Sequence, residues 1–168
     1  GVTDRPIDVR AEVLADLGAL GFLLLLSFVL PAVEEVGLRG YYLDALQERF
    51  GPTVAGLLNG GTWATWHASF VYFPGYYANT TFDPELWWWL PSIVFQTLIF
   101  VWVYNNTDRS ILAVIVIHGT LNLTGELLGL APEMFPFQLP FLALVGAALV
   151  VSWQRDTDTR PTDGAGAP

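Results

Sequence analysis

Long apolar runs separated by short clusters of charged residues dominate the pattern along this chain of 168 residues. A helix that crosses a membrane needs about 20 mostly apolar residues, and the runs come close to or exceed that length. Trp and Tyr, which concentrate where hydrocarbon meets lipid headgroups, stand at several of their ends. We therefore predict an all-α, polytopic transmembrane helical bundle of about five spans, at residues 17–33, 54–73, 86–107, 110–125 and 134–154.

Composition also favours a membrane protein over a water-soluble bundle. Hydrophobic residues make up 53% of the chain and charged residues 14%, whereas soluble domains are about one-quarter charged. We expect a transmembrane domain over residues 1–153, followed at 154–168 by a polar, disordered tail rich in Pro and Gly. The start has no initiator methionine and no signal peptide, which is consistent with upstream spans outside this sequence.

The charged residues exclude some functions. The formal net charge is −9, and all seven basic residues are arginines. A nucleic acid needs a basic face on its partner, so we expect no nucleic-acid binding and take the lipid bilayer as the surroundings of the protein. The acidic, Lys-free composition suits a halophilic prokaryote. The absence of cysteine excludes disulfides, thiol nucleophiles and Cys-ligated zinc.

The arginines also predict an orientation, because basic residues are enriched in short cytoplasmic loops. If the spans alternate, five arginines fall on one side and two on the other. The larger group lies in the first and third connections and the tail, which puts the active-site side toward the cytoplasm of a prokaryotic cell membrane. The five are Arg39, Arg49, Arg109, Arg155 and Arg160, and the two are Arg5 and Arg10.

Two adjacent glutamates, Glu34 and Glu35, end the first apolar run. No strong breaker precedes Gly51, so we expect the helix to continue that far. Glu35 and Arg39 are then i and i+4 with the acid on the N-terminal side, the favourable order for an ion pair. Glu34 points about 100° away from Glu35. We predict that Arg39 neutralises Glu35 and leaves Glu34 free to act as a base.

Helix geometry brings three further polar residues to about the same depth as Glu34. Glu34 and His67 lie roughly 26 and 24 Å from the turn between the first two spans, on antiparallel helices. His118 and Asn122 share one helix face. They lie roughly 16 and 22 Å from the turn between the third and fourth spans, near Thr107. Titratable groups are costly inside a membrane, so we interpret the four residues as a functional site inside the bundle.

The polar residues form three motifs, and their ordered set resembles the CAAX prenyl endopeptidase and bacteriocin-processing (CPBP) family of intramembrane proteases. Each motif alone is weakly specific, whereas the set in this order is fairly specific. Trp63 stands where Phe is commoner, a departure that we expect to leave the chemistry unchanged. The motifs are Glu34-Glu35-Val-Gly-Leu-Arg39, Trp63-Ala-Thr-Trp-His67 and His118-Gly-Thr-Leu-Asn122.

The resemblance implies an intramembrane endopeptidase that cleaves near the C-terminus of a membrane-associated or prenylated-type substrate. Glu34 and His67 would hold and deprotonate a water molecule. His118 and Asn122 would donate hydrogen bonds to the oxyanion that forms. Glu35 and Arg39 would support these groups. This glutamic-type scheme needs no cofactor, and its partner is a peptide or a membrane-tethered protein.

Three alternatives stay open. In a metalloendopeptidase, Glu34, His67 and His118 would bind Zn²⁺ and leave the fourth position to water, an established catalytic ligand set. A non-catalytic membrane-binding or immunity protein could keep the same fold. A proton-coupled transporter could use intramembrane Glu and His as a relay, although the internal repeats and interrupted helices typical of transporters are not apparent.

Overall fold

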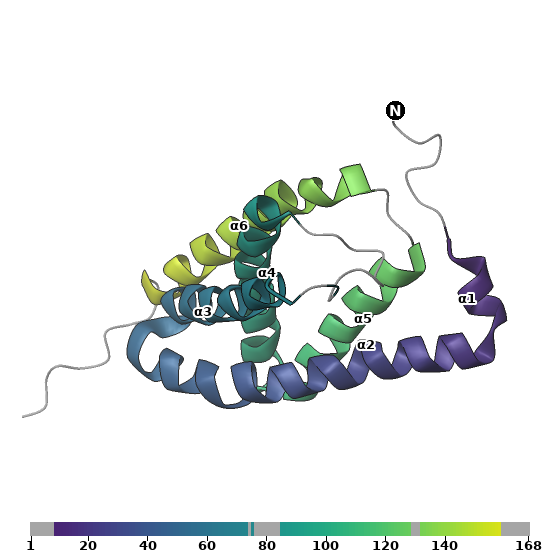
Figure 1. Ribbon diagram of the computed structural model, residues 1–168. Coiled ribbons are helices and arrows are strands. Elements are labelled where there is room, and N and C mark those ends of the chain that lie inside the picture. Colours follow the sequence, from purple (N-terminus) through teal and green to yellow (C-terminus); the bar gives the residue numbers. More distant parts are fainter. Residues whose placement is uncertain (1–8, 74, 76–84, 129–131, 159–168) are drawn as a thin grey trace, which may run out of the picture.

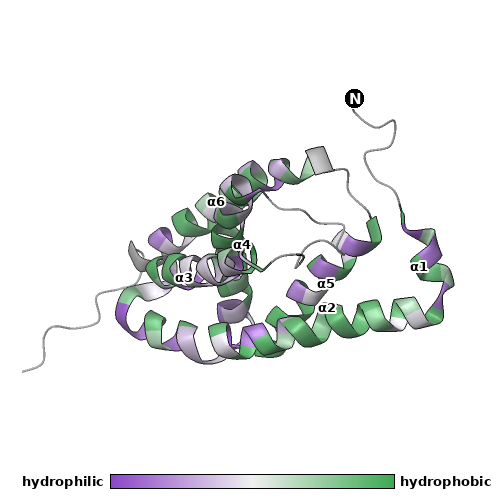
Figure 2. Cartoon of the chain, in the orientation of Figure 1, coloured by the Kyte–Doolittle hydropathy of each residue, from purple (hydrophilic) through white to green (hydrophobic). Residues whose placement is uncertain are grey.

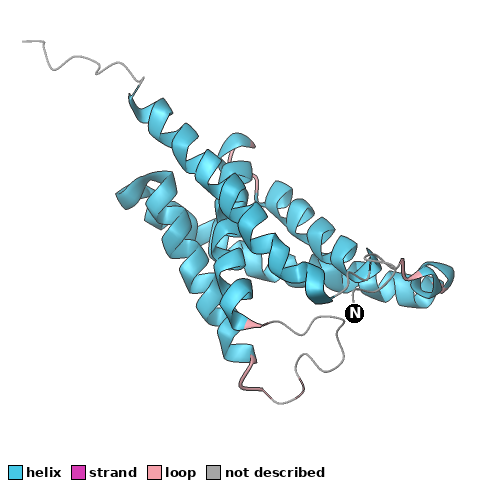
Figure 3. Cartoon of the chain, turned by 90° about the horizontal axis from the view of Figure 1, so that it is seen from above, coloured by secondary structure: helices cyan, strands magenta, loops and turns pink. Residues whose placement is uncertain are grey.

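The structure is a computed structural model that describes residues 9–73, 75, 85–128 and 132–158. Within these ranges the chain forms helices and short loops, with no strand (Figures 1 and 3). The helices in chain order are α1 (Ala11–Ala15), α2 (Leu17–Gly37), η1 (Leu38–Tyr42), α3 (Leu43–Phe70), α4 (Leu86–Asn106), α5 (Ile111–Leu128), η2 (Pro132–Phe137) and α6 (Gln138–Asp158).

Four helical stretches of the described chain are long and apolar enough to cross a membrane: Leu17–Phe70, Leu86–Asn106, Ile111–Leu128 and Met134–Arg155. The first contains the first two predicted spans, on either side of Gly51. Figure 2 shows that α2 is hydrophobic over most of its length, and many of its large apolar side chains are exposed. An apolar outer surface suits lipid, so the predicted helical membrane bundle is confirmed.

Gly51 makes the turn that separates the two arms of the first stretch. Its backbone angles, φ 70° and ψ 173°, lie in a region that is essentially restricted to glycine. Pro52 follows, and its fixed φ suits the first residue of a helix. Beyond this turn the chain doubles back (Figure 1), and Nδ2 of Asn59 donates to the Leu38 carbonyl oxygen at 2.8 Å. The predicted helical hairpin is therefore confirmed.

The helix that leads to this turn is not uniformly α-helical. Residues of η1 form a π-helix, and the Leu43 N–H bonds to the Leu38 carbonyl, which also accepts the Asn59 hydrogen bond. A π-turn inserts a residue and changes which side chains face the neighbouring helix, and such turns are frequent at functional sites. Here η1 carries Arg39, which is fully buried.

Helix α4 lies at the centre of the bundle, where it packs against α3, α5 and α6, while α2 packs against α5. Small residues let these helices approach closely. A Cβ atom on Gly60 of α3 would lie 3.0 Å from Thr97 Cβ on α4, and one on Gly119 of α5 would lie 2.4 Å from the Phe28 ring on α2. These two crossings bring α2, α3, α4 and α5 together around the polar residues.

Helix α6 extends to Asp158, beyond the predicted end of the transmembrane domain at residue 153. Residues 159–168 of the predicted tail lie outside the described residues. The domain boundary and the disorder of the tail stay predictions.

Candidate active site

The ion pair predicted within the first motif is the centre of a buried polar cluster. Nη1 of Arg39 lies 3.0 Å from Oε1 of Glu35, and both side chains are 0% exposed. The side chains meet because the α2 helix continues into η1, which keeps residues four apart on one face. Glu35 is therefore neutralised by Arg39, as the spacing predicted.

Three further side chains fix the Arg39 guanidinium. Nη2 donates to Thr97 Oγ1 on α4 at 3.2 Å, and Thr97 in turn donates to the Ile93 carbonyl at 2.9 Å. The guanidinium carbon lies 4.5 Å from the Trp63 ring centroid and 5.1 Å from that of Phe100. Such cation–π contacts are strongest where water is excluded. Arg39 is thus held from two sides, by α3 and by α4.

His118 joins the same cluster from α5. Its Nδ1 lies 2.8 Å from Oε1 of Glu35, and the residue is 4% exposed. A carboxylate paired with arginine can only accept, so Nδ1 carries the hydrogen and donates it. Nε2 is then the ring atom available for chemistry. Glu35 is more than a support for Arg39, because it sets the orientation and tautomer of His118.

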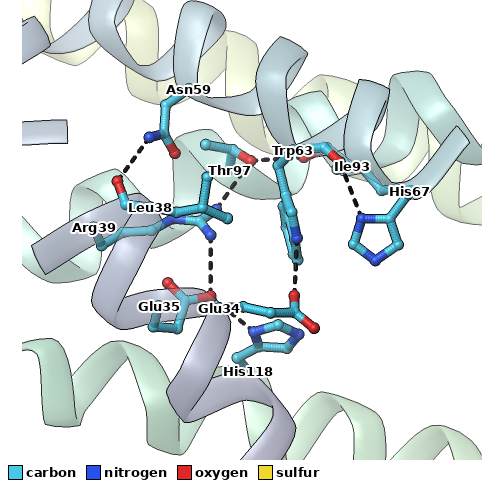
Figure 4. Close-up of polar contacts among 10 residues, drawn as sticks. All are labelled: Glu34, Glu35, Leu38, Arg39, Asn59, Trp63, His67, Ile93, Thr97 and His118. Carbon is cyan, nitrogen blue, oxygen red and sulfur yellow. Dashed lines mark hydrogen bonds and ion pairs between the residues drawn. The ribbon is translucent and has the colours of Figure 1, made fainter. Parts of the chain in front are cut away.

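Glu34 has a different environment from its neighbour. Its Oε2 accepts a hydrogen bond of 2.9 Å from the Trp63 indole N–H on α3, and the residue is half-buried. Its carboxylate lies beside the His118 ring in Figure 4. Counting residues along the hairpin had placed His67 level with Glu34. The direct partner of Glu34 is instead Trp63, which lies one helical turn closer to Gly51 than His67 does.

His67 lies on the same face of α3 as Trp63, four residues further along. Its Nδ1 lies 3.0 Å from the Trp63 carbonyl oxygen, which can only accept, so Nδ1 donates and Nε2 is free. Its ring contacts Trp63 and Trp89 edge-on, at centroid distances of 5.1 and 5.3 Å. Both histidines therefore have an Nε2 lone pair when neutral, and both rings contact Trp63, which lies 5.2 Å from the His118 ring.

Asn122 is the predicted site residue that the cluster does not include. It lies one helical turn beyond His118 on α5 and is exposed. In the described part of the chain, no hydrogen bond joins its side chain to the cluster. The structure therefore brings together Glu34, Glu35, Arg39 and His118, places His67 against the same Trp63 ring that contacts His118, and leaves the exposed Asn122 outside the cluster.

Comparison with known proteins identifies the family. Residues 16–124, which contain all three motifs and most of the cluster-forming helices, match the family described as "Type II CAAX prenyl endopeptidase Rce1-like". The match covers more than half of the chain. This chain belongs to that CAAX endopeptidase family. The resemblance seen in the motifs is confirmed.

A curated relative agrees with this assignment. The chain is 32% identical over 133 residues to "CAAX prenyl protease 2" of the archaeon Methanococcus maripaludis. The aligned region covers 77% of this chain and 48% of the relative. The chain thus spans about half the length of this member of the CAAX endopeptidase family.

The zinc alternative can be tested on the side chains themselves. The free Nε2 atoms of His67 and His118 suit it, since metal-binding histidines usually donate their other N–H to a carbonyl or carboxylate. The distances between the acidic and histidine side chains do not suit zinc. Within residues 9–73, 75, 85–128 and 132–158, no three His, Asp or Glu side chains are grouped closely enough to hold one ion. This arrangement does not favour a zinc site, and the metal requirement stays a prediction.

Sequence reasoning missed two residues of this polar cluster. Trp63 was placed in a motif but given no chemical role, and its indole N–H is the donor to Glu34. Thr97 was not singled out, because a single Thr in an apolar helix is unremarkable by sequence. Its role is visible only in three dimensions, because Thr97 is fully buried and accepts a hydrogen bond from the Arg39 guanidinium.

Proposed function

We propose that this chain is the catalytic part of an intramembrane endopeptidase. Its substrate is a peptide or membrane-tethered protein, cut near its C-terminus, and the family name makes prenylated-type substrates the first to test. The observation that carries this proposal is the contrast between two adjacent carboxylates. Oε1 of Glu35 is occupied by both Arg39 and His118, whereas Glu34 receives a single neutral donor and remains half-buried, beside the His118 ring in Figure 4.

Glu34 is the general base in this proposal. A water molecule binds between its carboxylate and Nε2 of His67, and Glu34 takes a proton as the oxygen attacks the peptide carbonyl carbon. The carbonyl oxygen becomes an oxyanion. When the C–N bond breaks, the proton held by Glu34 passes to the departing amine, and the second proton of the water stays on the new carboxyl group. The products are a carboxylic acid and an amine, which become a carboxylate and an ammonium group by proton transfer.

Stabilisation of the oxyanion falls to His118 and Asn122. Because His118 donates Nδ1–H to Glu35, its Nε2 bears a hydrogen only in the doubly protonated ring, and this is the form that can donate to an oxyanion. Asn122 supplies a second donor from the next turn of α5. A donor of this kind contributes about 3 to 4 kcal/mol to the transition state in other proteases.

We also infer that the active-site side faces the cytoplasm. Arg39 is buried in the cluster and so does not count toward the orientation. Of the remaining six arginines, four lie in the connections and tail predicted to be cytoplasmic. Basic residues near span ends favour that side of the membrane.

A cleavage assay on the full chain in detergent, with a quenched fluorescent peptide that has a farnesylated C-terminal motif, tests the function. We expect Glu34→Gln to lower kcat at least 100-fold, in the range of the larger general-base effects. Glu48→Gln is the matched control, because Glu48 is an exposed glutamate on the same hairpin. Cleavage that survives Glu34→Gln would refute the proposed base. Cleavage abolished by a chelator and restored by Zn²⁺ would favour the metal-dependent alternative.

A further inference from the structure

The hydrogen bond between Trp63 and Glu34 joins two motifs of the site. Indole Nε1 lies 2.9 Å from Oε2 of Glu34 (Figure 4). A buried indole N–H needs a partner, and this one finds it in the carboxylate of the proposed base. Phenylalanine, which is commoner at this position, would fill much of the space but would have no hydrogen to donate. The departure to Trp63 therefore gives Glu34 a contact that the sequence alone did not lead us to expect.

Packing fixes the indole independently of Glu34. Trp63 is 2% exposed, and the Arg39 guanidinium carbon lies 4.5 Å from its ring centroid. The rings of His67 and His118 contact it edge-on at 5.1 and 5.2 Å. With neighbours on several sides, the direction of the N–H is set by the core. The flexible Glu34 side chain therefore adapts to the indole, and not the reverse.

We propose that Trp63 is a positioning residue whose indole N–H holds Oε2 of Glu34, so that Oε1 is left to accept the proton of the attacking water. This inference rests on the proposed role of Glu34 as the base. A base must lie within hydrogen-bond reach of its proton, and small errors in placement lower the rate steeply. Hydrogen bonds to charged groups are strong enough for the loss to be about 10- to 100-fold.

The decisive variant removes only the donor. Trp63 in the full chain is replaced by 3-benzothienylalanine, which has sulfur in place of the N–H group and nearly the same shape. We expect kcat to fall about 10- to 100-fold with little change in KM, because the lost contact orients a base and does not bind substrate. Trp63→Phe should behave similarly, and Trp102→Phe, at a position 41% exposed on α4, should leave both constants unchanged. A benzothienylalanine variant with the kcat of the wild type would overturn the proposal.

A spectroscopic test does not depend on activity. The chain has seven Trp residues, whose indole N–H resonances can be recorded on ¹⁵N-labelled protein in detergent. The resonance that disappears in Trp63→Phe should shift in Glu34→Gln and stay in place in Glu48→Gln. An unmoved resonance would overturn the positioning contact even if peptide is cleaved. A shifted resonance in a chain that cleaves nothing would support the contact and count against the proposed function.

Discussion

Replacing Arg39 by methionine tests whether the buried ion pair organises the site. Methionine keeps most of the side-chain length but removes the charge and all donors. The Glu35 carboxylate would stay buried, 0% exposed, with His118 as its remaining partner at 2.8 Å. Breaking a buried pair by removing one partner costs about 3–5 kcal/mol. We expect a loss of that size in the free energy of unfolding, measured by SDS titration in mixed micelles.

A double-mutant cycle shows whether the loss comes from the unpaired charge. Glu35→Gln alone leaves Arg39 buried and charged, so it should also be costly. In the double variant neither charge is left uncompensated, and the combined loss should be smaller than the sum of the single losses by about 2 kcal/mol, within the range for residues in contact.

The ion pair between Arg109 and Asp44 provides the matched control. Its atoms lie 3.5 Å apart, and the Arg109 side chain is 64% exposed. Exposed pairs contribute at most about 1 kcal/mol, so Arg109→Met should have a small effect. Equal losses for Arg39→Met and Arg109→Met, or additive losses in the cycle, would show that the buried pair does not carry the stability assigned to it.

Two further predictions follow from helix packing and from the arginine distribution. Gly119→Ala should destabilise the chain and lower activity, because the new Cβ would lie 2.4 Å from the Phe28 ring. Gly37→Ala is its control, because a Cβ atom there would have nothing within 4 Å. Equal thermal stability of the two variants would contradict the close crossing of α2 and α5. The orientation can be read from single cysteines introduced into this Cys-free chain. In intact cells a membrane-impermeant maleimide should label Glu12→Cys and should reach Glu48→Cys only after lysis, and the reverse pattern would invert the proposed topology.

Much of the fold could be predicted because its determinants are local. Apolar runs of membrane-spanning length identify the helices, and Gly51 followed by Pro52 marks the reversal. The Glu35–Arg39 pair depends only on helical spacing. None of these features requires knowledge of how one helix packs against another.

The pairing across helices could not be predicted in the same way. Counting residues from Gly51 placed His67 level with Glu34, but the π-helical turn of η1 interrupts the regular repeat before the reversal, and Trp63 is the residue that contacts Glu34. The bond from His118 to Glu35 depends on how α5 crosses α2, where Gly119 lets the backbones approach. Neither the rotation nor the distance of that crossing is encoded in a motif.

The same crossing explains how two neighbouring glutamates acquire different chemistry. Oε1 of Glu35 contacts both Arg39 and His118, so the Glu35 carboxylate is paired with partners inside the protein. Glu34 is rotated by about 100° on the same helix and meets a neutral indole donor, which orients the carboxylate without cancelling its charge. A general base needs both a fixed position and a retained charge. In this bundle the indole of Trp63 fixes the position of the Glu34 carboxylate and leaves its charge intact.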